Sequence, residues 1–165
     1  IMEASKGGTD MNITTFRIDD RLIHGQVVTA WIAHSDAKQI LVADDAAAKD
    51  TLQQSLLKMA TPKKVDLKIM SLEDAKQLIQ NDESDTKTLL LVRGPKQALY
   101  LIDSCSDVKS INVGNINMKK GKRKILGNCW LNDEEEKDIR LLAEKVEVEV
   151  RAVPNEHKQI LVNLL

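Results

Sequence analysis

Short, uninterrupted apolar runs recur along this chain, and they constrain its fold more than any other feature. Three of them occupy residues 40–43, 89–92 and 111–113. Runs of this length without polar alternation are typical of strands that are covered on both faces, as in a parallel sheet. A further strand is expected before them, over residues 12–18. The chain therefore predicts a sheet whose strands are mostly parallel.

Amphipathic segments of helical period lie between these strands. They predict helices over residues 26–34, 46–60, 74–80 and 133–145, with a last helix after Pro154. Ser71 stands three positions before Asp74, which predicts a capped helix start. The alternation of strand and helix indicates right-handed crossover connections. We expect an α/β fold, an open and mostly parallel doubly wound sheet with helices on both faces.

One strand has a different pattern from the others. Residues 146–153 alternate strictly between apolar and charged side chains, as in Val146, Glu147, Val148, Glu149, Val150 and Arg151. Strict alternation is typical of a strand with one face in water. This segment is therefore expected to be an antiparallel strand at the edge of the sheet.

Composition narrows the class of protein. Hydrophobic residues make up 42% of the 165 and charged residues 30%, which suits a globular domain. The longest apolar runs are far too short to span a bilayer, so the chain is not expected to be membrane-spanning itself. Residues 1–10 are polar and are expected to be a linker or cloning remnant rather than a signal peptide. Residues 11–165 are expected to form a single domain.

Neither a cofactor nor a metal is indicated. Cys105 and Cys129 lie far apart, with no second Cys or His at ligand spacing, so no zinc site or disulfide framework is encoded. No glycine-rich nucleotide loop follows a strand, which ranks a nucleotide-binding module last among the candidate classes. Two reduced cysteines are expected, in a cytoplasmic protein.

Positive charge is concentrated in one short run despite a net charge of -1. The run contains Lys119, Lys120, Lys122, Arg123 and Lys124. Such a run is usually a solvated loop, although it can also speed association with an acidic partner. Aromatic side chains are not interleaved with it, so nucleic-acid binding is not expected. The sequence leaves both the solvated loop and the docking role open.

The loop after the first expected strand carries the chemistry. It contains Asp19, Asp20, Arg21, His24 and Gly25, and a helix is expected to start after it. The free N–H groups of a helix start favour an anion, so they would meet a phosphate carried by His24.

Arginines flank this histidine and complete a phosphate-binding pattern. Arg17 and Arg21 offer planar forks for phosphate oxygens. Gly25 is expected to let the backbone approach closely. A neutral imidazole is a good nucleophile near pH 7, and its phosphoramidate passes the group on readily. A lone loop histidine is more often an ordinary surface residue, and this reading is kept for His34 and His157.

The resemblance to a known family is strongest at residues 17–27, which read RIDDRLIHGQV. This stretch strongly resembles the active loop of IIB components of the mannose/fructose/sorbose family of the bacterial phosphotransferase system. Residues 42–45 resemble the second strand of that family with its paired acids, 112–114 its mid-chain glycine turn, and 153–154 its last strand-to-helix junction. The likeness extends from Met11 to the C-terminus.

The resemblance implies a protein-N(π)-phosphohistidine–sugar phosphotransferase. His24 would accept a phosphoryl group from the phosphohistidine of a IIA domain and pass it to a sugar held by the IIC/IID membrane components. Mannose, fructose, sorbose and amino sugars are all compatible with it. By analogy Arg17 and Arg21 would bind the phosphate. The protein would act in the cytoplasm, at the inner face of the membrane.

Some residues around this loop have roles that the sequence leaves open. Either Asp19 or Asp20 could hold the arginines or orient His24. A second loop is expected to contribute Asp45, Asn112 and Gly114. Asn115 replaces the second glycine that is usual after Gly114, and since Asn tolerates a left-handed backbone, the glycine turn is expected to survive. Ile116 stands where methionine is common.

A competing class is a receiver-like signalling domain that is phosphorylated on Asp44 or Asp45. Adjacent acids after a strand support this reading. They serve equally well as the N-cap of the helix expected from Ala46, and capping is the commoner use of Asp at such a junction. The label on histidine is acid-labile and alkali-stable, whereas an acyl phosphate on aspartate is lost in base, so chemistry can separate the two.

Overall fold

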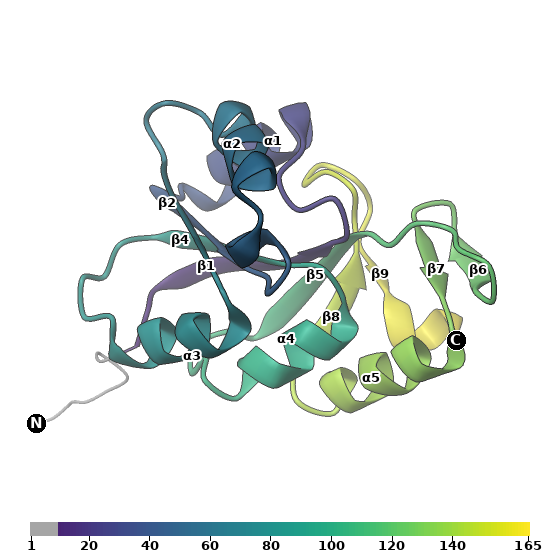
Figure 1. Ribbon diagram of the computed structural model, residues 1–165. Coiled ribbons are helices and arrows are strands. Elements are labelled where there is room, and N and C mark those ends of the chain that lie inside the picture. Colours follow the sequence, from purple (N-terminus) through teal and green to yellow (C-terminus); the bar gives the residue numbers. More distant parts are fainter. Residues whose placement is uncertain (1–9) are drawn as a thin grey trace, which may run out of the picture.

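A seven-stranded sheet forms the centre of the computed structural model, which describes residues 10–165 (Figure 1). The expected linker, residues 1–10, falls outside the described residues except for Asp10. The sheet order is β3-β2-β4-β1-β5-β8-β9, and every neighbouring pair is parallel except β8 with β9. The strands are β1 (Ile13–Asp19), β2 (Gln39–Ala43), β3 (Asp66–Met70), β4 (Thr88–Val92), β5 (Ser110–Asn115), β8 (Glu147–Val150) and β9 (Gln159–Ile160).

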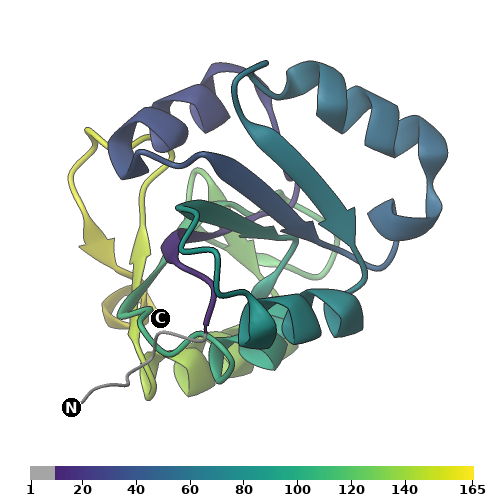
Figure 2. The same cartoon turned by 90° about the vertical axis from the view of Figure 1, so that its left-hand side faces the viewer.

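Helices cover both faces of this sheet, as Figures 1 and 2 show. On one face lie α1 (Gly25–Ser35), the 3-10 turn Ala47–Lys49 and α2 (Thr51–Ala60), and on the other lie α3 (Leu72–Asn81), α4 (Pro95–Ile102) and α5 (Asp133–Ala143). Each layer has its own apolar core, one around Trp31 and Leu57 and one around Leu101 and Ile139. The predicted α/β fold with helices on both faces is confirmed.

The uninterrupted apolar runs became inner strands because both of their faces are covered. Every residue of β2 and β4 is buried. Such strands need apolar side chains on both sides of the sheet, which removes any alternation. β3 lies at the edge, and its exposed Asp66 and Lys68 interrupt the apolar pattern, so the sequence did not reveal it.

The C-terminal part differs from its prediction. β8 lies between β5 and β9 and pairs with β5 in parallel, so it is not the edge strand. The antiparallel edge strand exists, but it is β9. Glu149, expected in water, is 2% exposed because it binds Arg151 and Asn112. The helix predicted after Pro154 is wrong, since β9 and the 3-10 turn Leu161–Leu164 follow instead.

A separate two-stranded hairpin was not predicted. It consists of β6 (Arg123–Leu126) and β7 (Cys129–Leu131), which pair antiparallel, and it projects from the sheet at the right of Figure 1. Part of the basic run is therefore a strand rather than a loop. Cys129 and Leu131 anchor the hairpin in the core beside α5.

The helices of the described part are all short. Within residues 10–165, none has the length and apolar character that crossing a membrane requires.

Candidate functional site

The His24 loop, residues 20–24, follows the carboxyl end of β1. β1 lies between β4 and β5 at the centre of the sheet. From β1 the chain passes through α1 to β2, in one half of the sheet. From β4 it passes through α4 to β5, in the other half. The loop is therefore at the topological switch point, where open α/β sheets place their functional groups.

His24 occupies the N-cap position of α1. Its backbone is extended, with φ -154° and ψ 109°, and its side chain makes no capping hydrogen bond. The ring is half-buried, and Nε2 is buried without a hydrogen-bond partner in the described part of the chain. The first turn of α1 contains no acidic side chain, so no residue of that turn neutralises the positive end of the helix dipole.

Glycine at position 25 is explained by its backbone conformation rather than by the close approach that the sequence suggested. Its φ is +52°, a left-handed conformation that L side chains rarely adopt, while a Cβ there would meet nothing within 4 Å. The residue is needed for the turn from the loop into α1 rather than for close approach.

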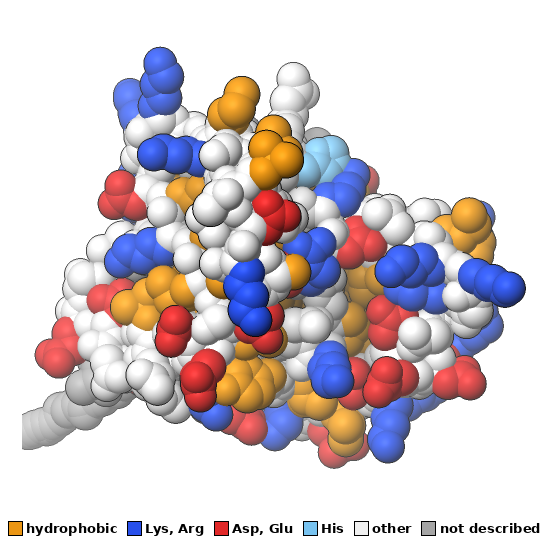
Figure 3. Space-filling view, in the orientation of Figure 1, with side chains coloured by type: hydrophobic (Ala, Val, Ile, Leu, Met, Phe, Trp, Pro, Cys, Tyr) orange, Lys and Arg blue, Asp and Glu red, His pale blue; other side chains and the backbone are white. Residues whose placement is uncertain are grey.

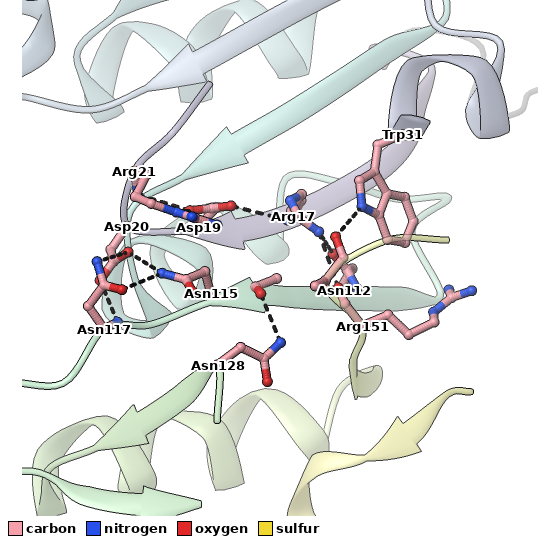
Figure 4. A network of polar contacts seen from close by, with 12 residues as sticks. Arg17, Asp19, Asp20, Arg21, Trp31, Asn112, Asn115, Asn117, Asn128 and Arg151 are labelled. Atoms are coloured by element: carbon pink, nitrogen blue, oxygen red, sulfur yellow. Dashed lines mark hydrogen bonds and ion pairs between the residues drawn. The ribbon is translucent and has the colours of Figure 1, made fainter. Parts of the chain in front are cut away.

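The two predicted arginines have separate positions, with Asp19 between them (Figure 4). Arg17 is 2% exposed and its Nη2 donates to Asp19 Oδ2 at 3.1 Å. The side chain of Arg21 is 37% exposed, and its Nε and backbone N donate to Asp19 Oδ1 at 3.3 and 3.0 Å. Arg21 is thus held at the surface by a buried carboxylate, whereas Arg17 lies inside the fold.

Both terminal nitrogens of the Arg17 guanidinium donate to protein acceptors. Besides Asp19, it donates through Nη1 to Asn112 Oδ1 at 2.6 Å and to the Arg151 carbonyl at 3.3 Å. Burial lowers the pKa of this guanidinium, against the opposing effect of Asp19. In this structure Arg17 holds Asp19 and Asn112, and its contact with a phosphate stays a prediction.

A polar network continues from Arg17 towards the edge of the sheet. Asn112 Nδ2 donates to both carboxylate oxygens of Glu149, at 3.3 and 3.2 Å, and Arg151 binds the same carboxylate at 3.0 and 2.8 Å. Glu149 raises the pKa of Arg151. Trp31 lies between the guanidiniums of Arg17 and Arg151, 5.2 and 5.1 Å from its ring centre, and donates to the Ala152 carbonyl. The network ties α1 to the core beneath the loop.

The predicted second loop is divided by the structure. Asn112 and Gly114 lie within β5 rather than in a turn, and Asn115 is its last residue. Among the described residues, the left-handed non-glycine positions do not include Asn115. The predicted glycine turn is therefore wrong. Gly114 lacks a side chain because Arg17 fills that space.

Asp20 joins the His24 loop to the segment after β5. Its carboxylate accepts hydrogen bonds from Asn115 Nδ2 at 2.9 Å, from Asn117 N at 2.7 Å and from Asn117 Nδ2 at 3.1 Å (Figure 4). The Asp20 amide also donates to the Asn115 carbonyl. Asp20 therefore holds the His24 loop against the segment after β5. Asp19 is the carboxylate that binds both Arg17 and Arg21.

Arg93, at the end of β4, was missed by the sequence analysis. It donates to both oxygens of Asp44, at 3.1 and 2.8 Å, and to the Asp20 carbonyl at 3.1 Å. Asp44 raises the pKa of Arg93. The only available signal was an arginine directly after a buried strand, and its two partners are distant in sequence. Arg93 links the loops after β1, β2 and β4.

Each of the paired acids accepts a hydrogen bond from a backbone amide at a helix start. Asp44 Oδ2 accepts from the Ala47 amide, as the capping interpretation predicted, and also binds Arg93. Asp45 Oδ1 accepts from the Leu72 amide at the start of α3 rather than near Ala46. Within residues 10–165, no group of three or more His, Cys, Asp or Glu side chains is arranged to hold a metal ion. Among the described residues, Asp45 makes no hydrogen bond or ion pair with Arg17 or Arg21, whose carboxylate partner is Asp19.

The family described as "PTS system sorbose subfamily IIB component" matches residues 13–165. The N-acetylgalactosamine-specific phosphotransferase enzyme IIB component 1 of Escherichia coli (strain K12) is 31% identical, covering 92% of this chain and 97% of that protein. The mannose-specific EIIAB component of the same strain is 32% identical, with 94% of this chain covering 49% of that longer protein.

A solved structure has the same fold. The crystal structure of the IIBSor domain of the sorbose permease from Klebsiella pneumoniae superposes with a TM-score of 0.89 at 28% sequence identity. The match covers 93% of this chain and 96% of that one.

Proposed function

This chain belongs to the sorbose subfamily of phosphotransferase-system IIB components, and from that premise we propose that His24 is its phosphoryl-carrying residue. IIB components are sugar phosphotransferases, so sugar transport is the process that the chain serves. One observation supports this above others: His24 is half-buried at the N-terminus of α1, in the same loop as Arg21, whose side chain is held by Asp19.

The cysteines offer no competing acceptor. Cys105 is 5% exposed and Cys129 is fully buried, and burial raises the pKa of each thiol to about 12. The thiolate is the nucleophilic form of cysteine, and at neutral pH it would be very scarce at these positions. Both side chains also lie in an apolar core. These facts support histidine rather than cysteine as the phosphoryl acceptor.

The ring nitrogen proposed to attack is Nδ1, the N(π) atom. Nε2 is buried, so a phosphoryl group could not reach it without movement of the ring. Attack by Nδ1 forms a new P–N bond while the P–N bond of the donor histidine breaks. In the second transfer, the sugar hydroxyl attacks phosphorus, the P–N bond to His24 breaks and the hydroxyl proton is released.

Charge on the transferring group would be compensated by two features of the loop. The first amides of α1 supply N–H donors and the positive end of the helix dipole. Arg21 adds a permanently charged fork whose position Asp19 fixes. Such fixed groups stabilise the transition state because they need no reorganisation when the charge moves.

The proposed partners follow from the family. A IIA domain would donate the phosphoryl group, and the IIC/IID membrane components would present a sugar of the mannose, fructose, sorbose or amino-sugar class at the cytoplasmic face. One relative carries the name EIIAB and is about twice as long as its matched region, which supports a IIA donor. Residues 11–165 would act as the one IIB domain, and the match over 13–165 supports this.

A receiver-like domain phosphorylated on Asp44 or Asp45 is not favoured. Arg93 binds both oxygens of Asp44, and Asp45 caps α3. Family membership argues in the same direction.

Labelling with a radioactive phosphoryl group tests the acceptor. The wild-type chain should take label from a phosphorylated IIA donor and also from phosphoramidate, a small donor that needs no docking. The label should be lost in acid and survive alkali, and His24→Ala should abolish it. His34→Ala and His157→Ala are matched controls, since both side chains are exposed and lie outside the loop. Full labelling of His24→Ala, or alkali-labile label, would overturn the proposal.

A further inference from the structure

The hairpin β6–β7 and the segment before it divide the basic run into two sets. Lys122 Nζ binds Glu135 Oε2 at 3.1 Å, and Arg123 binds Glu136, so these two cations face the amino end of α5. Lys119, Lys120 and Lys124 are exposed, and none of them makes an ion pair with another described residue. We call these three residues the lysine surface.

The acidic side chains that are paired in this region bind Lys122 and Arg123 rather than the lysine surface. Acidic residues of the first turn of α5 are engaged on the inner side of the hairpin. Figure 3 shows blue side chains gathered over the hairpin, with red ones below them towards α5. The hairpin therefore presents uncompensated positive charge to solvent, although the chain as a whole has a net charge of -1.

Hydrogen bonds connect the segment just before the lysine surface to the His24 loop. Asn117, two positions before Lys119, donates from its backbone and side chain to Asp20, which belongs to that loop. A cavity of about 530 Å³ lies between them, lined by Asp20, Arg93, Gln97, Asn117, Lys119 and Lys122 among others. A molecule bound at the lysine surface would thus contact the rim of the same cavity as the loop.

Resting on the proposed function, we propose that the lysine surface docks the phosphorylated IIA donor through an acidic face of that protein. The donor arrives with a dianionic phosphoryl group, whereas a sugar acceptor of any of these classes carries no negative charge. A positive surface at the edge of the site raises the encounter rate with an acidic partner and weakens as salt screens it. The lysine surface thereby acts in the first transfer, from IIA to His24.

The triple variant K119Q/K120Q/K124Q tests this role. With phosphorylated IIA as donor, the second-order rate of labelling at low salt should fall about tenfold, a modest change within the range of electrostatic steering. Its dependence on salt should become shallower. With phosphoramidate as donor, the labelling rate should equal that of the wild type, because no docking is needed.

A matched triple, K63Q/K64Q/K109Q, removes the same charge elsewhere. These lysines are exposed and make no ion pair with described residues. They lie just before the amino ends of β3 and β5, whereas the His24 loop follows the carboxyl end of β1. This control should keep the wild-type rate and salt dependence. An equal loss in both triples would overturn docking in favour of a general charge effect.

The remaining outcomes separate the two proposals. If neither donor labels wild-type His24, the proposed function itself fails. If the lysine-surface triple loses labelling by phosphoramidate as well, the hairpin acts on the site rather than on the donor, and docking is wrong. Wild-type transfer from IIA with reduced binding to vesicles of phosphatidylglycerol and phosphatidylcholine would assign the surface to the membrane instead.

Discussion

The guanidinium of Arg17 occupies the space in which a Cβ of residue 114 would stand. Arg17 is 2% exposed and holds Asn112 and Asp19, so it cannot yield without breaking buried hydrogen bonds. Gly114→Ala should therefore lower the free energy of unfolding by about 3 kcal/mol, the size expected when a buried ion pair is disrupted. Denaturant unfolding measures the change.

Gly127→Ala is the matched control for this substitution. Gly127 is exposed, and a Cβ there would meet nothing within 4 Å. Its free energy of unfolding should differ from the wild type by less than about 1 kcal/mol, the usual range for a glycine change at an open site. Equal stability of Gly114→Ala and the wild type would contradict the role given to Arg17.

Arg21 and Arg17 should respond differently to substitution. Arg21→Ala removes the exposed fork and should slow labelling of His24 about 100-fold with little change in melting temperature, since it removes charge compensation in transfer. Arg17→Ala removes a buried cation and should lower the melting temperature by several degrees. Labelling rates and thermal unfolding distinguish them. Unfolding of Arg21→Ala would show that Arg21 is structural.

Patterns that depend on burial were readable in the sequence, and those set by distant partners were not. β2 and β4 were predicted because covered strands need apolar residues throughout. β8 was misplaced because the charge of Glu149 predicted contact with water, yet Arg151 and Asn112 satisfy that charge inside the fold. In the sequence, a glutamate with buried hydrogen-bond partners cannot be told from a glutamate that faces water.

The site shows the same limit. The position of His24 followed from a strand end, a glycine and a helix start, which are local features. Arg17 and Arg21 have the same side chain four positions apart, but β1 ends between them, so one is buried and the other exposed. Arg93 reaches Asp44 over 49 positions, and no local pattern encodes that contact.

Both thiols should be unreactive in the folded protein. Burial raises the pKa of Cys105 and Cys129 to about 12, so little thiolate exists at pH 8. A disulfide reagent such as Ellman's reagent should modify neither thiol in the native state and both after denaturation. Rapid native modification of either would contradict this burial, and Cys105→Ser and Cys129→Ser identify which thiol had reacted.

Asp44 should make stability depend on pH in the acid range. Burial by itself would raise the pKa of Asp44, but hydrogen bonds from Arg93 and the Ala47 amide outweigh it and hold the pKa below the ordinary value of 3.8. A carboxyl whose pKa is lowered on folding contributes stability that is present above its unfolded pKa and is lost as pH falls through the folded one. The contribution should therefore be complete at pH 7 and decline below about pH 4.

Asp44→Asn measures that contribution directly. The difference in free energy of unfolding between wild type and Asp44→Asn should be largest at neutral pH and shrink in acid. Because Arg93 supplies the opposing charge, the difference should also be smaller in an Arg93→Gln background at pH 7. A difference that grows as the pH falls would mean that desolvation of the Asp44 carboxylate outweighs its attraction to Arg93.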